Sequence, residues 1–265
     1  MSLSIGIVGL PNVGKSTLFN ALTNNNILAA NYPFATIEPN TGIVPIPDKR
    51  LDDLSTLYAN APIKPATVTF LDIAGLVKGA SQGEGLGNQF LSHIRSCNAI
   101  VQVVRAFADP NVIHVDNNHD ALSDIEVINT ELVLADLQTV TNRLPKLEKE
   151  ARANPKLAPL LDNLKRAKKL LDDNQPLFKH AEQIDISLLE DLHLLTTKPV
   201  IYLFNMDEND LSDDSKKQTL RELVAPAQAL FVCAKLEAEL QTLDETDRQE
   251  LLASYGQTES GLLQL

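Results

Sequence analysis

Short apolar segments separated by loop and helix patterns recur along the chain and predict a mainly parallel β-sheet. The first, Leu3–Gly9, is rich in Ile and Val and leads through a glycine-containing turn into a helix expected from Lys15 to about Asn24. Further buried strands are expected at Thr67–Leu71, Ile100–Arg105, Val200–Asn205 and Leu230–Cys233. Because strands that alternate with helices form a sheet with helices on both faces, we expect an α/β fold.

Two long helical patterns interrupt this alternation between the strands at Ile100–Arg105 and Val200–Asn205. Apolar residues recur there at steps of three and four, which is typical of a heptad seam, and Asn154-Pro155 suit the start of the second helix. The seams comprise Val133, Leu137, Val140, Leu144 and Leu147, and then Leu157, Leu160, Leu164, Ala167 and Leu171. We expect residues 129–198 to be an inserted helical coiled-coil domain, or two amphipathic helices packed on the body, between residues 1–128 and 199–265 of the α/β domain.

The composition is that of a soluble globular protein, with 44% hydrophobic and 22% charged residues. The longest apolar stretches are far shorter than the roughly 20 residues that a membrane-spanning helix needs. The N-terminus lacks the basic region of a secretory signal, so we expect a cytoplasmic protein that does not interact with membranes. Cys97 and Cys233 lie in apolar surroundings, which favours buried free thiols over a disulfide or a metal site.

The formal net charge of −12 opposes binding to phosphate backbones. Neither strong non-specific nucleic-acid binding nor direct sequence-specific DNA binding is therefore expected of the whole surface. One local basic cluster, Lys165-Arg166 with Lys168-Lys169, is a candidate for binding an anionic partner. We favour the alternative that this cluster is a solvated helix face.

The segment from Gly9 to Thr17 matches the phosphate-binding pattern G-x-x-x-x-G-K-[ST]. A strand precedes it and a helix follows it, as the motif requires, which makes a chance glycine-rich turn a poor alternative. The glycines let backbone N–H groups face the phosphates, Lys15 would reach the β and γ phosphates, and the Ser16 hydroxyl would bind Mg²⁺. Nucleotide contacts are expected from Asn12, Val13, Gly14, Lys15, Ser16 and Thr17.

The segment Asp72-Ile73-Ala74-Gly75 fits the D-x-x-G element of nucleotide triphosphatases. In this element the carboxylate, here Asp72, holds Mg²⁺ through water, and the Gly75 N–H senses the γ-phosphate. The pattern is common by chance, but its position after a strand that follows the phosphate loop supports this role.

Between these two elements, Asn31–Gly42 is a polar stretch that contains proline. Such a stretch suits a switch segment that rearranges with the γ-phosphate. We expect the Thr36 hydroxyl to bind Mg²⁺ and act in catalysis, with Thr41 as the second candidate. The alternative is an inert surface loop.

Asn205-Met206-Asp207-Glu208 stands at a strand end where a GTPase would carry Asn-Lys-x-Asp. In the GTPase pattern the Asp accepts two guanine protons and the Lys stem covers the ring, whereas Glu208 is one methylene longer and Met206 is uncharged. Asn205 can still bond the N7 edge of a purine. We therefore expect ATP to bind better than GTP, with the backbone of Cys233-Ala234-Lys235 behind the base, unless that segment is only a strand end that leads into a helix.

Leu76 follows Gly75 where GTPases usually carry the Gln that orients the attacking water. Hydrolysis is therefore expected to be slow unless another group positions the water. Asn12 could help to hold a K⁺ ion beside the phosphates, and His114 could exchange a proton near the γ-phosphate. A surface or packing histidine is an equally good interpretation of His114.

These residues together resemble the YchF subfamily of Obg-like ATPases, within the TRAFAC class of P-loop NTPases. The motifs that carry the resemblance are G-L-P-N-V-G-K-S-T, N-Y-P-F-A-T-I-E-P-N-T-G, D-I-A-G-L-V-K-G-A-S-Q-G-E-G-L-G-N-Q-F-L and N-M-D-E. The resemblance implies a G domain interrupted by a coiled-coil arm, a preference for ATP, and association with ribosomes in translation or stress responses. It also implies a β-rich TGS domain after a stretch like Gly261-Leu262, and we expect that domain to be absent here.

Three functions are consistent with this sequence. The first is a slow ATPase that uses Mg²⁺, and K⁺ as a second candidate cation, and that acts as a switch read by a partner such as the ribosome. The second is a GTPase of the wider Obg type, which would require guanine binding despite Glu208. The third is a scaffold that binds partners through its coiled-coil arm while nucleotide only stabilises the fold.

Overall fold

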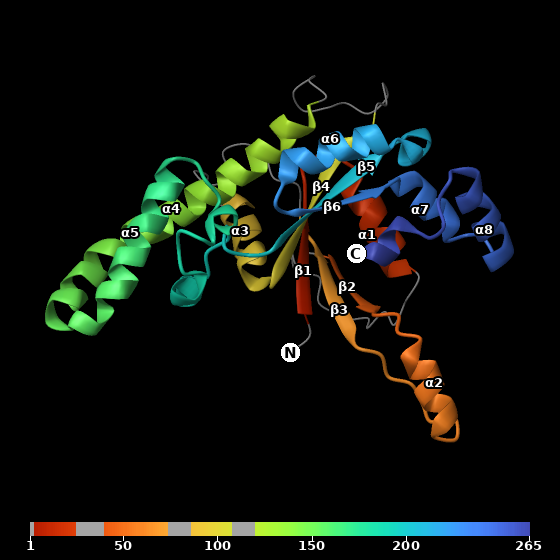
Figure 1. The fold of residues 1–265 in the computed structure, drawn as a ribbon, viewed down its shortest axis with the longest axis horizontal. Coiled ribbons are helices and arrows are strands. Elements are labelled where there is room, and N and C mark those ends of the chain that lie inside the picture. Colours follow the sequence, from red (N-terminus) through yellow and green to blue (C-terminus); the bar gives the residue numbers. More distant parts are fainter. Residues whose placement is uncertain (1–2, 25–39, 74–85, 108–119) are drawn as a thin grey trace.

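The computed structural model describes residues 3–24, 40–73, 86–107 and 120–265, and these form an α/β fold built around one sheet (Figure 1). The strands are β1 (Leu3–Val8), β2 (Asn40–Pro45), β3 (Thr67–Asp72), β4 (Ala99–Ala106), β5 (Val200–Met206) and β6 (Gln228–Val232). Their order is β2-β3-β1-β4-β5-β6, and every neighbouring pair is parallel except β2 with β3. The expected mainly parallel sheet is therefore confirmed.

Helices connect the strands and cover the sheet. They are α1 (Lys15–Asn24), α2 (Arg50–Leu57), α3 (Leu86–Ser96), α4 (Ala121–Ala153), α5 (Ala158–Asp172), α6 (Asp214–Val224), α7 (Ala234–Leu240) and α8 (Glu245–Ser254). Short 3-10 helices are η1 (Pro155–Leu157), η2 (Leu177–His180), η3 (Ile186–Leu192), η4 (Glu208–Ser212) and η5 (Gly261–Gln264). The main core lies between the apolar centres of the strands and helices α1, α3, α4 and α6, with α7 packed against α1.

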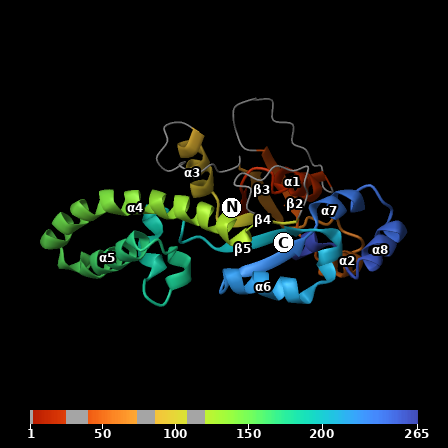
Figure 2. The same cartoon turned by 90° about the horizontal axis from the view of Figure 1, so that it is seen from above.

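Helices α4 and α5 project from the sheet as an antiparallel hairpin, which we call the arm (Figures 1 and 2). Both predicted heptad seams lie along its interface: Val140, Leu147 and Leu164 are buried in a core separate from that of the sheet. The first turns of α4 pack instead in the main core, through Ile125 and Ile128. One continuous helix thus joins the two cores, because its apolar positions face the sheet first and α5 later.

The turn at the tip of the arm follows the expected capping chemistry. The Asn154 side chain accepts a hydrogen bond from the backbone N–H of Lys156 at 3.2 Å, and Pro155 is the first residue of η1. The expected boundary between residues 128 and 129 falls inside α4, where the helix continues without a break. The division into two domains therefore remains a prediction.

The strand β2 was not expected, because no strand was predicted between the phosphate loop and Thr67, and β2 begins inside the predicted switch segment Asn31–Gly42. Thr41 pairs with Leu71 across β2 and β3, and because residues 31–39 lie outside the described residues, the switch role of this segment remains a prediction. An edge strand of six residues that contains Gly and Pro has little period-two signal, which explains the error. Asp72 is the last residue of the third strand in the chain, not a residue after the second.

Two other expectations can be compared with the described residues. Cys97 and Cys233 are both buried free thiols, as expected. Among the helices that the structure describes, none has the length and apolar character needed to cross a membrane.

Candidate functional site

The phosphate loop runs from the end of β1 into α1, and its backbone needs glycine at two places. Gly14 has φ +91°, and a Cβ atom there would lie 2.3 Å from the Asn205 Nδ2 atom. A Cβ atom at Gly9 would lie 2.8 Å from the carbonyl oxygen of Val103 in β4. Asn12 also adopts a positive φ of 64°, which Asn tolerates better than most residues. The motif glycines are therefore required by the loop's close contact with neighbouring strands.

Lys15, Ser16 and Asp72 meet at the carboxyl edge of the sheet. The Lys15 ammonium lies 2.9 Å from Asp72 Oδ1, and the Ser16 hydroxyl donates a hydrogen bond of 3.4 Å to Asp72 Oδ2. The side chains of Lys15 and Asp72 are only 11% and 8% exposed. The sequence placed all three residues at one site, and the structure brings them together although 57 positions separate Lys15 from Asp72.

This arrangement suits the binding of a Mg²⁺-phosphate group. A carboxylate and a hydroxyl are the hard oxygen donors that Mg²⁺ prefers, and a lysine beside them can neutralise phosphate oxygens. Within the described ranges, no three His, Cys, Asp or Glu side chains cluster in a way that could hold a metal ion. A cation at Ser16 and Asp72 would thus need further oxygens from the nucleotide or from water.

Several predicted residues lie outside the described residues. They are Thr36, Gly75, Leu76 and His114. Their roles as Mg²⁺ ligand, γ-phosphate sensor, replacement for the catalytic Gln and proton donor therefore remain predictions.

A cavity of about 1060 Å³ lies beside the phosphate loop and contains the expected base-binding residues. Predicted residues that line it are Asn12, Gly14, Thr17, Asn205, Met206, Glu208, Cys233 and Ala234. They come from the phosphate loop, the end of β5 and the start of α7, three places that are distant in sequence. The space is large enough for a purine and part of its ribose, since ligand pockets typically measure about 300–1,000 Å³.

Asn205 joins the phosphate loop to the segment behind the base. Its Nδ2 group donates to the carbonyl oxygen of Val13 at 2.9 Å, and its Oδ1 atom accepts from the Ala234 N–H at 2.9 Å. Asn205 is 5% exposed and its partners are equally buried. The sequence predicted a purine contact for Asn205, but the structural role of these two bonds was missed. Its place at the carboxyl end of a buried strand was the available signal.

Cys233 is the N-cap of α7, and its Sγ atom accepts from the Leu236 N–H at 3.5 Å. Burial raises the pKa of the Cys233 thiol. The thiol is therefore held protonated and acts as a small capping group. The contact of this segment's backbone with a base remains a prediction.

Other residues of the cavity were not assigned by sequence. Phe107 follows β4 and lines the cavity, and the Arg105 guanidinium lies 4.4 Å from the centre of its ring. An aromatic residue directly after a buried strand is a signal that was available, because ligands bind at this edge of a parallel sheet. The remaining members are Asp207, Asn209, Asp210, Ala238, Glu239 and Thr242, and the cavity also includes Lys235 of the predicted segment behind the base.

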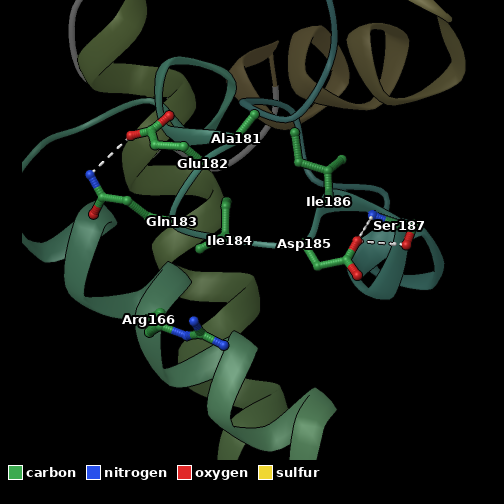
Figure 3. Close-up of a pocket in the computed structure, with 8 residues that line it drawn as sticks. All are labelled: Arg166, Ala181, Glu182, Gln183, Ile184, Asp185, Ile186 and Ser187. Carbon is green, nitrogen blue, oxygen red and sulfur yellow. Dashed lines mark hydrogen bonds between the residues drawn. The ribbon is translucent and has the colours of Figure 1, made fainter.

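A second cavity, of about 490 Å³, lies on the arm and not at the phosphate loop (Figure 3). It is lined by Arg166 of α5 and by residues 181–187. Polar atoms at its rim bond to their neighbours: the Gln183 amide donates to Glu182 at 3.1 Å, and the Ser187 hydroxyl donates to Asp185 at 2.6 Å. None of the predicted nucleotide-binding residues lies in this cavity.

Comparison with protein families matches residues 4–150 to the model described as 50S ribosome-binding GTPase. The Ribosome-binding ATPase YchF of Bacillus subtilis (strain 168) is 46% identical over 275 aligned positions, which cover 100% of this chain and 74% of that protein. The protein of the same name from Escherichia coli O157:H7 is 45% identical and aligns with 99% of this chain and 73% of its own length.

Solved structures give the same result for the fold. The YchF GTPase of Schizosaccharomyces pombe superposes with a TM-score of 0.79 at 36% identity, covering 99% of this chain and 73% of that one. A GTP binding protein from Pyrococcus horikoshii OT3 superposes with a TM-score of 0.54 at 18% identity and supports the fold alone. The relatives are named both as ATPases and as GTPases, so their names leave the choice of purine to be argued from the site.

Proposed function

Because the chain belongs to the YchF family, we propose that it is a cytoplasmic Mg²⁺-dependent ATPase that acts as a nucleotide-driven switch at the ribosome. The observation that carries the proposal is the cavity in which the phosphate loop meets Asn205, Met206 and Glu208. Lys15, Ser16 and Asp72 stand together beside it and would hold the phosphates and the cation. Mg²⁺, when bound, would neutralise charge on the β and γ phosphates.

The proposed preference for ATP follows from the chemistry at the end of β5. A guanine clamp needs a short carboxylate opposite N1–H and the 2-amino group, with a lysine stem over the ring. Here the lysine position is Met206, which is 1% exposed and lines the cavity, and the carboxylate belongs to the longer Glu208. Adenine offers a 6-amino donor in place of the guanine donors, and a carboxylate farther from the strand suits it. GTP would bind more weakly.

Slow hydrolysis is the second part of the proposal. Leu76 replaces the usual Gln, and Asn12 remains our candidate for supporting K⁺ beside the phosphates. Thr36, Gly75 and His114 keep their proposed roles in Mg²⁺ binding, γ-phosphate sensing and proton exchange. An enzyme with slow intrinsic turnover fits a switch in translation or stress responses better than it fits a metabolic enzyme.

We place the ribosome contact on the distal arm, defined as residues 143–169 of α4, η1 and α5. This segment has nine basic and three acidic residues, a net charge of +6, whereas the rest of the chain then carries −18. Six basic side chains in it are exposed and form no side-chain ion pair or hydrogen bond among the described residues: Lys146, Lys149, Arg152, Lys156, Arg166 and Lys169. From the sequence alone we favoured a solvated helix face for the α5 cluster, but the turn at Asn154 adds the α4 side chains to it and makes it a larger basic surface.

The chemistry of the distal arm fits the phosphates of structured RNA. It contains no aromatic residue on which unpaired bases could stack, and no large hydrophobic residue within it is exposed enough to enter a membrane. The rest of the chain is acidic and would be repelled by RNA phosphates. The arm would therefore be the part that faces the ribosome.

Rates of nucleotide hydrolysis test the proposal. ATP hydrolysis should be slow, should rise when ribosomes are added, and should be lost in Lys15→Met, which cannot neutralise the phosphates. Faster turnover with GTP than with ATP would favour the GTPase alternative. Hydrolysis that neither K⁺ nor ribosomes can raise would favour a nucleotide-stabilised scaffold that binds partners through the arm.

A further inference from the structure

Glu208 is held from both sides of its carboxylate. The Lys235 ammonium lies 2.9 Å from Glu208 Oε1, and the Tyr255 hydroxyl donates to Glu208 Oε2 at 3.4 Å. Glu208 begins η4 directly after β5, Lys235 lies in the first turn of α7, and Tyr255 follows α8. Three separate elements therefore converge on one carboxylate at the wall of the cavity.

The charge of Glu208 also affects both partners. Its carboxylate raises the pKa of Lys235 through a hydrogen bond and raises the pKa of Tyr255 through electrostatic attraction of the phenol proton. At neutral pH both partners are therefore donors, and the carboxylate between them is an acceptor only.

We infer that Lys235 and Tyr255 are positioning residues that fix the Glu208 carboxylate and thereby determine which purine the cavity accepts. The inference rests on the proposed ATP preference and extends it from one residue to a set of three. Glu208 is the group that would touch the base, and the other two act through it.

The choice of purine would depend on how many lone pairs of the Glu208 carboxylate remain free and on where they point. A free glutamate could rotate until both oxygens faced N1–H and the 2-amino group of guanine, as a GTPase aspartate does. Lys235 holds one oxygen and Tyr255 holds the other, so one lone pair of each oxygen is used and the carboxylate cannot rotate freely toward both guanine donors. A lone pair that remains on the fixed carboxylate can accept the 6-amino proton of adenine, whereas the O6 atom of guanine would meet a negative acceptor.

Neither positioning residue is needed to fill the core. The Lys235 side chain is 72% exposed and Tyr255 is half-buried, so removing their polar atoms leaves no large cavity. The variants Lys235→Met and Tyr255→Phe keep most of each side chain and should fold. Changes in nucleotide affinity can then be assigned to the carboxylate rather than to unfolding.

The test measures Mg²⁺-ATP and Mg²⁺-GTP affinity by calorimetry for the wild type, Lys235→Met, Tyr255→Phe and the double variant. We expect ATP to bind about 3- to 10-fold more weakly in the double variant, because each lost hydrogen bond has a modest net value. GTP affinity should stay the same or rise, so the ATP-to-GTP affinity ratio falls. Lys235→Arg should keep the wild-type ratio, since arginine also donates to a carboxylate.

Matched controls are Lys64→Met and Tyr58→Phe, two exposed residues remote from the cavity, which should leave both affinities unchanged. An ATP-to-GTP ratio in the double variant equal to that of the wild type would overturn the inference, as would an equal loss for both nucleotides. A wild type that prefers GTP would instead refute the proposed function itself, so the two failures are distinguishable.

Discussion

Replacing Asn205 tests whether the phosphate loop and the base-binding segment are held by one side chain. In Asn205→Ala, the Val13 carbonyl and the Ala234 N–H both lose their partner, and the residues that carry them are only 1% and 4% exposed. A buried polar group left without a partner costs about 1–3 kcal/mol. The expected loss in the free energy of unfolding is therefore about 2–6 kcal/mol for the two groups, a large part of the stability of a typical domain.

The variant Asn205→Asp tests the two hydrogen bonds of Asn205 separately, because it keeps one and removes the other. The shape is kept, and one oxygen still accepts from the Ala234 N–H, but the group that faced the Val13 carbonyl changes from a donor to an acceptor. We expect a loss of at least about 1–3 kcal/mol near neutral pH. The loss should shrink in acid, because a protonated aspartate can again donate to Val13, and such a group with a raised pKa gives stability that is lost as the pH rises.

The assay is equilibrium urea denaturation without nucleotide, read as the midpoint and slope for each variant at two pH values. Asn20→Ala on the exposed face of α1 is the control and should change stability by less than about 0.5 kcal/mol. If Asn205→Ala also stays within that limit, the two hydrogen bonds do not couple the loops and the reasoning is refuted.

Three further predictions follow from other parts of the molecule. Lys15→Met should reduce ATP affinity at least about 10-fold, because a charged phosphate contact is lost, and an unchanged affinity in a titration with Mg²⁺-ATP would contradict this role. Neutralising four basic residues of the distal arm to Gln should weaken ribosome pelleting and reduce its salt dependence, while Mg²⁺-ATP affinity is unchanged; equal pelleting would refute the RNA contact. The residues for that variant are Lys149, Arg152, Lys156 and Lys169. Burial raises the pKa of Glu237 above its ordinary 4.5, so the folded protein binds this proton more tightly than the unfolded chain. Stability should therefore fall as the pH rises from about 4.5 through the folded pKa, and Glu237→Gln should lack this decline in urea titrations; a parallel decline in both would show that another group is responsible.

The sequence predicted those parts of the structure in which a local pattern and the long-range arrangement agree. The phosphate loop has a distinctive spacing, and the apolar strands and heptad seams report burial directly, so their positions were correct within one or two residues. Asp72 could be joined to Lys15 because the carboxyl ends of parallel strands meet at one edge.

Contacts that depend on the packing of distant elements could not be predicted in this way. Nothing in the chain indicates that Tyr255, 47 positions after Glu208, bonds to its carboxylate. The strand β2 is stabilised by its pairing with β3. Its own residues carry little strand pattern, so the sequence alone did not predict it. The antiparallel turn at the tip of the arm likewise determined which basic residues lie together.

The central claim is that the cavity beside the phosphate loop selects adenine through the residues that end β5. The most direct measurement is the affinity of the purified protein for Mg²⁺-ATP and Mg²⁺-GTP, side by side, for the wild type and for Glu208→Asp combined with Met206→Lys. The account predicts that ATP binds more tightly to the wild type and that the double variant shifts toward GTP. Tighter binding of GTP by the wild type would contradict it.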